Sequence, residues 1–259
     1  MERIDKFISD RTPMSRKDVK LLLKQGGVTV NGQTVQDSSL KINPETDSVN
    51  AGGRTLVYRK NTCVMLNKPD GYVCSTRDGR SETVLSLVPE ELRTKDMFPA
   101  GRLDKDSKGF VFLTDDGDLA HRMLSPKKHL TKCYLVRLEN EYDEIYEELF
   151  ASGLEIDGGE ICLPAKVCGI SHDRHFAFVG LDEGKYHQVK RMFQAAGNKV
   201  LSLFRVQIGG LVIDGNLAPG ECLEVFNNDI EKMLSQFDFS DARKSVEISF
   251  WSYLINNKL

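Results

Sequence analysis

The chain has 259 residues, of which 40% are hydrophobic and 28% are charged, the composition of an ordinary globular protein. This length allows one large domain or two smaller ones, and a net charge of −3 excludes a protein that attracts nucleic acid through a strongly basic overall field. The six cysteines form no C-x-x-C pair, the five histidines are scattered, and the charged N-terminus is unlike a signal peptide. We therefore expect no metal site and a cytoplasmic protein with reduced thiols.

Charge is distributed unevenly along the chain. Residues 1–58 contain nine Lys or Arg and seven Asp or Glu, a balance of +2, whereas residues 59–259 contain 26 and 31, a balance of −5. A weakly basic head on an acidic body indicates two modules with different tasks. The stretch 50–61, with two glycines and a short basic run, is the expected boundary. We therefore expect one domain over 1–58, a second over 61–239, and a tail over 240–259.

The N-terminal part is predicted to contain two helices and a hairpin. Apolar residues at i, i+3 and i+4 predict a first helix over residues 4–8. Ser15, followed three residues later by Asp18, predicts a capping box at the start of a second helix, which we expect to end at Gly26. The dipeptide Asn31-Gly32 predicts a type I′ turn between two short strands.

Four basic side chains lie off the apolar face of the second helix: Arg16, Lys17, Lys20 and Lys24. Such a face is usually only solvated surface, but four cations beside a hairpin can also neutralise several phosphates. The pattern R-I-D-K-F, S-R-K-D-V-K and G-x-V-x-V-N-G over residues 1–58 resembles the S4-like RNA-binding domain. The resemblance implies that the four cations and Asn31 contact structured RNA that is recognised by its shape.

The sequence beyond residue 60 is predicted to mix short strands with helices. Apolar runs, alternation and helical periodicity predict strands over 63–66, 110–114 and 131–138, and helices over 143–153 and 187–197. Hairpin signals, such as Asp157-Gly158, outnumber β-α-β crossovers. We therefore predict an α+β body with a mixed, largely antiparallel sheet and flanking helices.

Four motifs follow one another in this part: N-K-P-x-G at 67–71, G-R-L-D-x-D-S-x-G at 101–109, K-C-Y at 132–134 and E-G-K-Y-H-Q-V-K-R-M at 183–192. Together they resemble the catalytic body of the RNA pseudouridine synthases, in the branch that carries an N-terminal S4-like domain and acts on ribosomal RNA. The resemblance extends over about residues 1–226. The tail 240–259 has no counterpart, and we expect a terminal helix, a contact surface or a disordered segment there.

The form of the last motif bears on the substrate. H-Q-V-K-R-M is more similar to members that modify small-subunit ribosomal RNA than to large-subunit members, which more often show an R-Q-V-R-R-like form. The resemblance therefore implies that one uridine of 16S ribosomal RNA, uridine 516, is converted to pseudouridine. Base flipping and a second contact on a neighbouring RNA helix both need RNA that proteins have not yet covered, so a partly assembled small subunit is the expected partner. Large-subunit 23S ribosomal RNA is the alternative.

The chemistry of this conversion needs a carboxylate. The bond from sugar C1′ to base N1 breaks, the base turns, and C5 binds C1′. Cleavage builds positive charge on the sugar, which a carboxylate stabilises or traps covalently, as in retaining glycosidases. Asp104 is the candidate, in a turn framed by Gly101 and Gly109, and the sequence leaves open whether it attacks the sugar or removes a sugar proton. We expect Lys68 to shape the neighbouring loop and Asp106 to be a turn residue.

Other site residues follow from the resemblance. A carboxylate in a pocket without water needs a nearby cation to remain ionised, and the basic position of the family falls on Lys190, although most lysines on helices are only solvated. Tyr134 lies on a buried face by alternation, either as a core aromatic or, as the resemblance implies, as the ring that stacks on uracil and helps remove the C5 proton. Arg102 is implied to occupy the space that the flipped base vacates, and His187 and Gln188 to contact RNA.

Two other functions compete with this one. The segment 103–109 also resembles the D-x-D-x-T loop of haloacid-dehalogenase-type phosphatases, but the preceding D-M-F-P-A-G-R cannot form the strand that this fold requires. A non-catalytic protein that only binds ribosomal RNA is disfavoured because Asp104, Tyr134 and Lys190 are all present, and an assay is needed to separate the two. Isomerisation has no redox step, and the sequence contains no nucleotide-binding glycine loop, so we expect no cofactor. We expect a monomer.

Overall fold

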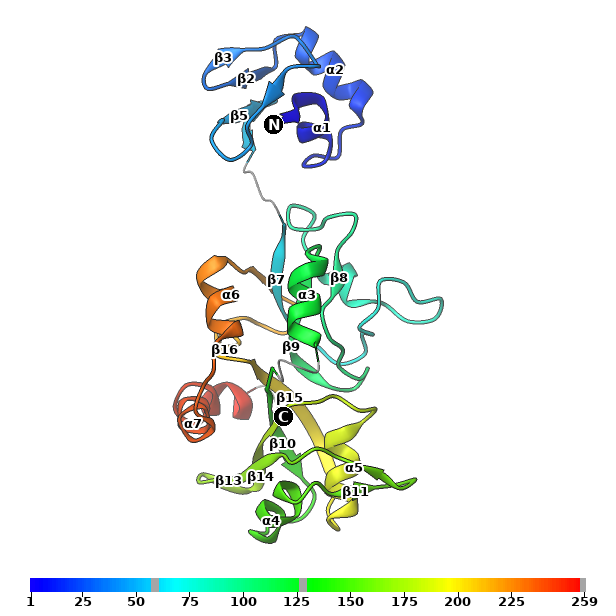
Figure 1. The fold of residues 1–259 in the computed structure, drawn as a ribbon, viewed down its shortest axis with the longest axis vertical. Helices are drawn as coiled ribbons and strands as arrows, with labels where there is room; N and C mark the ends of the chain where they lie inside the picture. Colours follow the sequence, from blue (N-terminus) through cyan, green and yellow to red (C-terminus); the bar gives the residue numbers. More distant parts are fainter. Residues whose placement is uncertain (57–60, 126–129, 257–259) are drawn as a thin grey trace. The chain divides into compact units, whose positions relative to one another are not determined.

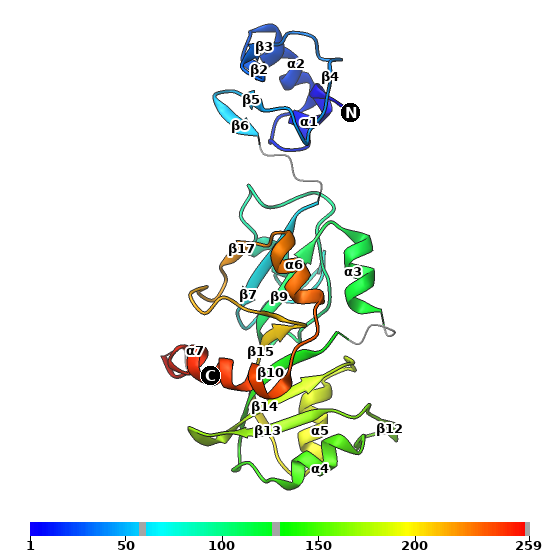
Figure 2. The same cartoon turned by 60° about the vertical axis from the view of Figure 1, so that its left-hand side comes forward.

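The structure of the chain is a computed structural model that describes residues 1–56, 61–125 and 130–256. The chain divides into two compact units, one formed by residues 1–62 with 89–96 and the other by residues 63–88 with 97–259. Each unit has its own apolar core. Figure 1 and Figure 2 show the helices and strands of each unit in two views.

The N-terminal unit contains two helices, α1 (Ile4–Ser9) and α2 (Arg16–Lys24), beside short strands. Its four-stranded sheet has the order β3-β2-β5-β6, and β1 pairs with β4. The strands are β1 (Glu2–Arg3), β2 (Val28–Val30), β3 (Gln33–Thr34), β4 (Lys41–Ile42), β5 (Val49–Ala51) and β6 (Arg54–Leu56). The predicted capping box at Ser15 and Asp18 is confirmed. Asn31 and Gly32 have φ angles of 51° and 82°, as a type I′ turn requires.

The second unit is built on one large sheet, and the predicted α+β body is confirmed. In the described part of the chain the sheet has the order β13-β14-β10-β15-β9-β7-β17, with β16 beside β15 and β8 beside β9. The pairing of β15 with β9 is parallel, and the other pairings are antiparallel. The strands are β7 (Cys63–Lys68), β8 (Phe98–Pro99), β9 (Lys108–Thr114), β10 (Lys132–Leu138), β13 (Lys166–Ile170), β14 (Asp173–Leu181), β15 (Val200–Ile208), β16 (Leu211–Val212) and β17 (Cys222–Glu224).

Helices and one hairpin surround this sheet. They are the 3-10 helix η1 (Val84–Leu87), α3 (Gly117–Leu124), α4 (Ile145–Ala151), α5 (Gln188–Ala195), α6 (Asn227–Leu234), α7 (Phe239–Asn256) and the hairpin β11 (Glu155–Ile156) with β12 (Glu160–Ile161). The main core joins sheet residues such as Phe112 and Phe204 to residues of α3, α6 and α7. A separate aromatic group links α4 to α5, where Phe193 contacts Tyr146 and Phe150. None of the helices in the described ranges is long and apolar enough to cross a membrane.

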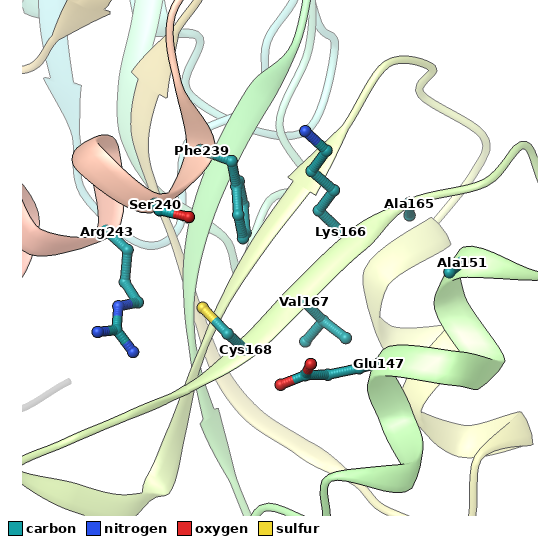
Figure 3. Close-up of a pocket in the computed structure, with 9 residues that line it drawn as sticks. All are labelled: Glu147, Ala151, Ala165, Lys166, Val167, Cys168, Phe239, Ser240 and Arg243. Atoms are coloured by element: carbon teal, nitrogen blue, oxygen red, sulfur yellow. The ribbon is translucent and has the colours of Figure 1, made fainter.

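The C-terminal tail forms helix α7, one of the three possibilities that the sequence leaves open. Its first residue, Phe239, packs its ring on Phe178 with 5.0 Å between the ring centroids, and Ala242 and Val246 enter the main core. Glu247 accepts hydrogen bonds from the backbone N–H and the hydroxyl of Ser171. Together α7, α4 and β13 line the pocket in Figure 3. Loop 101–109 contributes no residue to this pocket, which is therefore separate from the predicted catalytic residues.

The parallel contact between β9 and β15 depends on a glycine. Gly109 pairs with Arg205 and has a φ angle of 97°, a conformation that residues with a side chain rarely adopt. A Cβ atom at this position would lie 2.4 Å from the carbonyl oxygen of Arg205 and 2.9 Å from its nitrogen. The absence of a side chain therefore lets the two backbones meet at the end of loop 101–109.

We expect Gly109→Ala to lower the free energy of unfolding of the second unit by about 2–4 kcal/mol, because the new methyl group would overlap backbone atoms that cannot rotate away. Urea unfolding followed by circular dichroism measures this change. Gly79→Ala is the matched control, since a Cβ there meets no atom within 4 Å. Equal stabilities for the two variants would contradict the close backbone contact between β9 and β15.

Candidate active site

Loop 101–109, which holds the predicted catalytic carboxylate, is fixed from one side by a buried lysine. Lys68, at the end of β7, has no exposed surface. Its ammonium group donates hydrogen bonds to the carbonyl oxygens of Ser107 at 2.7 Å, Lys105 at 2.9 Å and Pro69 at 3.0 Å. All three N–H bonds thus have a partner, although burial lowers the pKa of Lys68. These contacts agree with the structural role expected of this lysine.

An arginine fixes the loop from the other side. Arg205 of β15 is 2% exposed, and its Nε donates to the carbonyl of Phe110 at 2.7 Å. Its Nη1 donates to the carbonyl of Arg102 at 3.3 Å, while Nη2 is buried and has no hydrogen-bond partner among the described residues. The sequence prediction missed Arg205. The available signal was a lone charged residue inside the apolar strand L-S-L-F-R-V-Q-I.

The strand register places these two cations in one row with the predicted tyrosine. Tyr134 of β10 pairs with Arg205 of β15, Arg205 pairs with Gly109 of β9, and Gly109 pairs with Lys68 of β7. Paired residues on neighbouring strands project to the same face of a sheet, so Tyr134 and Arg205 share a face. Tyr134 is 7% exposed, which confirms its predicted burial. The row runs from Tyr134 to the end of the loop that carries Asp104.

Asp104 faces two nitrogen groups from the region of α5. Its side chain is 24% exposed, and Oδ2 lies 3.4 Å from Nζ of Lys190. Oδ1 lies 3.5 Å from Nε2 of His187, and the hydroxyl of Ser107 is 3.5 Å from Oδ2. The structure therefore brings Asp104, Lys190 and His187 together, although Asp106 of the loop and Lys190 of α5 are 84 positions apart in the sequence.

Lys190 has a second carboxylate partner, which the sequence prediction treated only as a turn residue. Its Nζ donates to Oδ1 of Asp106 at 2.6 Å, a shorter contact than the one with Asp104. Partial burial would raise the pKa of Asp106, but the hydrogen bond and the charge of Lys190 outweigh it and lower that pKa. Asp106 is 68% exposed, so it holds Lys190 at the open side of the site.

The remaining predicted residues of the body differ in their surroundings. Arg102 is exposed in loop 101–109, and within the described part of the chain only its backbone carbonyl is held, by Arg205. His187 is the N-cap residue of α5 and has a φ angle of 49°, a left-handed conformation that is uncommon outside glycine, although His, Asn and Asp adopt it more often than other residues. Gln188 is buried, and its amide binds Glu183 and the N–H of Lys185. Gln188 thus shapes the loop before α5, and its contact with RNA stays a prediction.

The basic residues of α2 are arranged as the sequence predicts. All four are exposed, and no salt bridge is found for them among residues whose side chains are described: Arg16, Lys17, Lys20 and Lys24. Asn31 is exposed too, but its side-chain amide donates to Asp47 and its side-chain oxygen accepts from the N–H of Ser48. The cations of α2 are therefore free to meet an anionic partner, whereas Asn31 mainly holds its turn.

The site can carry out chemistry on a group that develops positive charge. A carboxylate in a fixed loop, with a lysine nearby, can stabilise a cation or attack it, and Tyr134 offers both a flat ring and a hydroxyl group. Within the described ranges, no three His, Cys, Asp or Glu side chains are grouped so that they could hold a metal ion.

Comparison with known proteins agrees with this chemistry. Residues 62–195 match the family model described as RNA pseudouridylate synthase, and residues 2–48 match the S4 domain. The ribosomal small subunit pseudouridine synthase A of Escherichia coli is 39% identical over 233 residues, covering 90% of this chain and 100% of that protein. The protein of the same name in Vibrio cholerae is 42% identical over 220 residues, covering 85% and 94%.

Two further relatives extend the comparison. An uncharacterised RNA pseudouridine synthase of Bacillus subtilis is 41% identical over 231 residues, covering 88% of this chain and 96% of that protein. A crystal structure of a pseudouridylate synthase superposes with a TM-score of 0.62 at 37% identity, covering 90% of this chain and 100% of that one. The chain therefore belongs to the family of RNA pseudouridine synthases and carries an S4 domain at its N-terminus.

Proposed function

We propose that this enzyme converts one uridine of 16S ribosomal RNA, uridine 516, to pseudouridine while the small subunit is being assembled. It acts as a monomer and without a cofactor. The observation that carries the proposal is the placement of Asp104 between Lys190 and His187, in a loop whose backbone is held on both sides. The names of the relatives from Escherichia coli and Vibrio cholerae support the small-subunit target.

In the proposed reaction the target uridine flips out of its helix and places its sugar above Asp104. The bond from C1′ to N1 breaks, and the carboxylate either traps C1′ or removes a sugar proton. Lys190 faces Asp104 with its positive charge from 3.4 Å, while it donates its closest hydrogen bond to Asp106 at 2.6 Å. The Asp104 oxygens thus remain available to the sugar.

The detached base stays in the site and turns so that C5 faces C1′. Tyr134 stacks on the uracil. As C5 bonds to C1′, the bond from Asp104 to C1′ breaks or the sugar proton returns from Asp104, and the tyrosine hydroxyl group then helps to move the proton from C5. The proton returns to N1, so that the product is an isomer of the substrate. Arg102, exposed in the same loop, occupies the space in the RNA that the flipped base leaves.

The S4 domain contributes affinity rather than chemistry. The exposed cations of α2 contact phosphates of a neighbouring RNA helix and release counterions, which positions the body on its target. Both contacts require RNA that is already folded locally and not yet covered by ribosomal proteins. A partly assembled small subunit meets both requirements.

We expect Asp104→Asn to fold and bind RNA but to form no measurable pseudouridine, because the change removes the charge while keeping the size of a side chain that is 24% exposed. Rates measured on small-subunit RNA test this. Asp106→Asn is the matched control: the same change two residues away should slow turnover by less than about tenfold. An Asp104→Asn rate within about tenfold of wild type would rule out the role assigned to Asp104.

We expect the triple change of Lys17, Lys20 and Lys24 to Ala to reduce the slope of log affinity against log salt by up to about 3, if each lysine meets a phosphate. Filter binding over a range of salt concentrations measures the slope. The control removes the same charge from exposed lysines of the body, Lys199, Lys232 and Lys244. Equal slopes for the wild type and the α2 variant would show that this basic face is only solvated surface.

The target itself is tested with four RNAs. Purified enzyme is given naked 16S RNA, partly assembled small subunits, mature small subunits and 23S RNA, and pseudouridines are mapped by primer extension after carbodiimide treatment. We expect a single site, at uridine 516, formed fastest in the partly assembled particle. A preference for 23S RNA would show that the enzyme modifies large-subunit RNA instead. Equal rates on naked and partly assembled 16S RNA would contradict the proposal that modification occurs during assembly.

A further inference from the structure

The loop before α5 presents an aromatic ring that the mechanism does not use. Tyr186 is 75% exposed, the highest value for an aromatic side chain among those described. Its ring stacks on the imidazole of His187, with 3.9 Å between ring centroids and 16° between the planes. His187 in turn lies 3.5 Å from Asp104. The two rings, here called the Tyr186-His187 shelf, thus extend from the reacting carboxylate out to solvent.

The exposure of Tyr186 does not come from a loosely held loop. The carbonyl of Tyr186 accepts a hydrogen bond from Arg191 at 3.1 Å, and the preceding N–H, that of Lys185, donates to the buried side chain of Gln188 at 2.9 Å. Lys185 also pairs with Glu160 at 3.1 Å. The backbone is therefore held in place while the ring is left uncovered. A partner that covers this ring does not have to order the loop first.

We propose that the Tyr186-His187 shelf stacks on the base of a nucleotide next to the target uridine and thereby holds the strand so that the flipped uridine stays at Asp104. The inference rests on the proposed function. When the uridine flips into the site, the nucleotides on either side of it in the strand lose a stacking partner. These nucleotides lie next to the one held at Asp104, and the two rings of the shelf extend outward from Asp104. A flat, fixed aromatic ring is the group that replaces such a partner, and it accepts any base because every base has a π face.

The first test compares three single variants on an RNA fragment that contains the target. Tyr186→Ala should raise KM and Kd for this RNA by roughly 5- to 150-fold, the range found when stacked aromatics are removed, and change kcat little. Tyr186→Phe keeps the ring and should behave as wild type. Phe226→Ala removes another exposed ring, which precedes α6 in a different part of the body from α5, and should have no effect (Figure 1, Figure 2).

The second test removes the other half of the stack. RNAs with an abasic nucleotide on the 5′ or the 3′ side of the target uridine are given to wild type and Tyr186→Ala. On the stacked side, loss of the base should weaken wild-type binding about as much as Tyr186→Ala does and have no further effect on that variant. The inference would be overturned if Tyr186→Ala bound the intact RNA as tightly as wild type does. It would also be overturned if the loss of affinity from Tyr186→Ala and the loss from the abasic nucleotide multiplied when the two changes were combined.

Two other outcomes have separate meanings. If wild-type enzyme forms no pseudouridine in any of the ribosomal RNAs, the proposed function fails, whereas the inference alone fails if wild type is active and Tyr186→Ala is equally active. An effect of Tyr186→Ala that appears with partly assembled particles and is absent with the RNA fragment would assign the shelf to a ribosomal protein and overturn the stacking role.

Discussion

The candidate active site depends on burying the ammonium group of Lys68 beneath the loop that carries Asp104. An ammonium group inside a protein is costly unless each of its donors is satisfied, and here three carbonyl oxygens satisfy them. Two of those carbonyls belong to Lys105 and Ser107, directly after Asp104, and the N–H of Ser107 binds the carbonyl of Asp104. Displacing the loop would leave the buried ammonium group without hydrogen-bond acceptors. The free-energy cost of that loss therefore holds the carboxylate of Asp104 in position.

Arg205 binds the backbone from the opposite side, although within the described residues its Nη2 has no hydrogen-bond partner and neither cation forms an ion pair with a carboxylate. Its guanidinium group donates to the carbonyl of Arg102 inside the loop and to that of Phe110 directly after it. Because Lys68 and Arg205 bind backbone oxygens, they fix the loop without neutralising Asp104. The cation that does face Asp104 is Lys190, and its closest bond goes to Asp106. The carboxylate is thus held in place while its side chain stays 24% exposed.

Local features were predictable from the sequence because they depend on neighbouring residues. The capping box of Ser15, the turn at Asn31 and the burial of Tyr134 follow from spacing and alternation. Arg205 and the bond between Asp106 and Lys190 were missed because they require the register of strands and the approach of segments far apart in the chain. The parallel pairing of β15 with β9 is of this kind, since it depends on two backbones meeting at Gly109 rather than on any local pattern.

The contrast between buried and exposed polar groups separates chemistry from recognition. Lys68, Arg205 and Gln188 are buried and bind only protein atoms, so they set the geometry around Asp104. Arg102 and Tyr186 lie on the same fixed loops with their side chains exposed. Changes to the buried set alter the position of the carboxylate, whereas changes to the exposed set leave it in place and alter what it meets. In the proposed function, binding of the RNA therefore depends on the exposed residues of these loops, and the reaction depends on the geometry that the buried ones set.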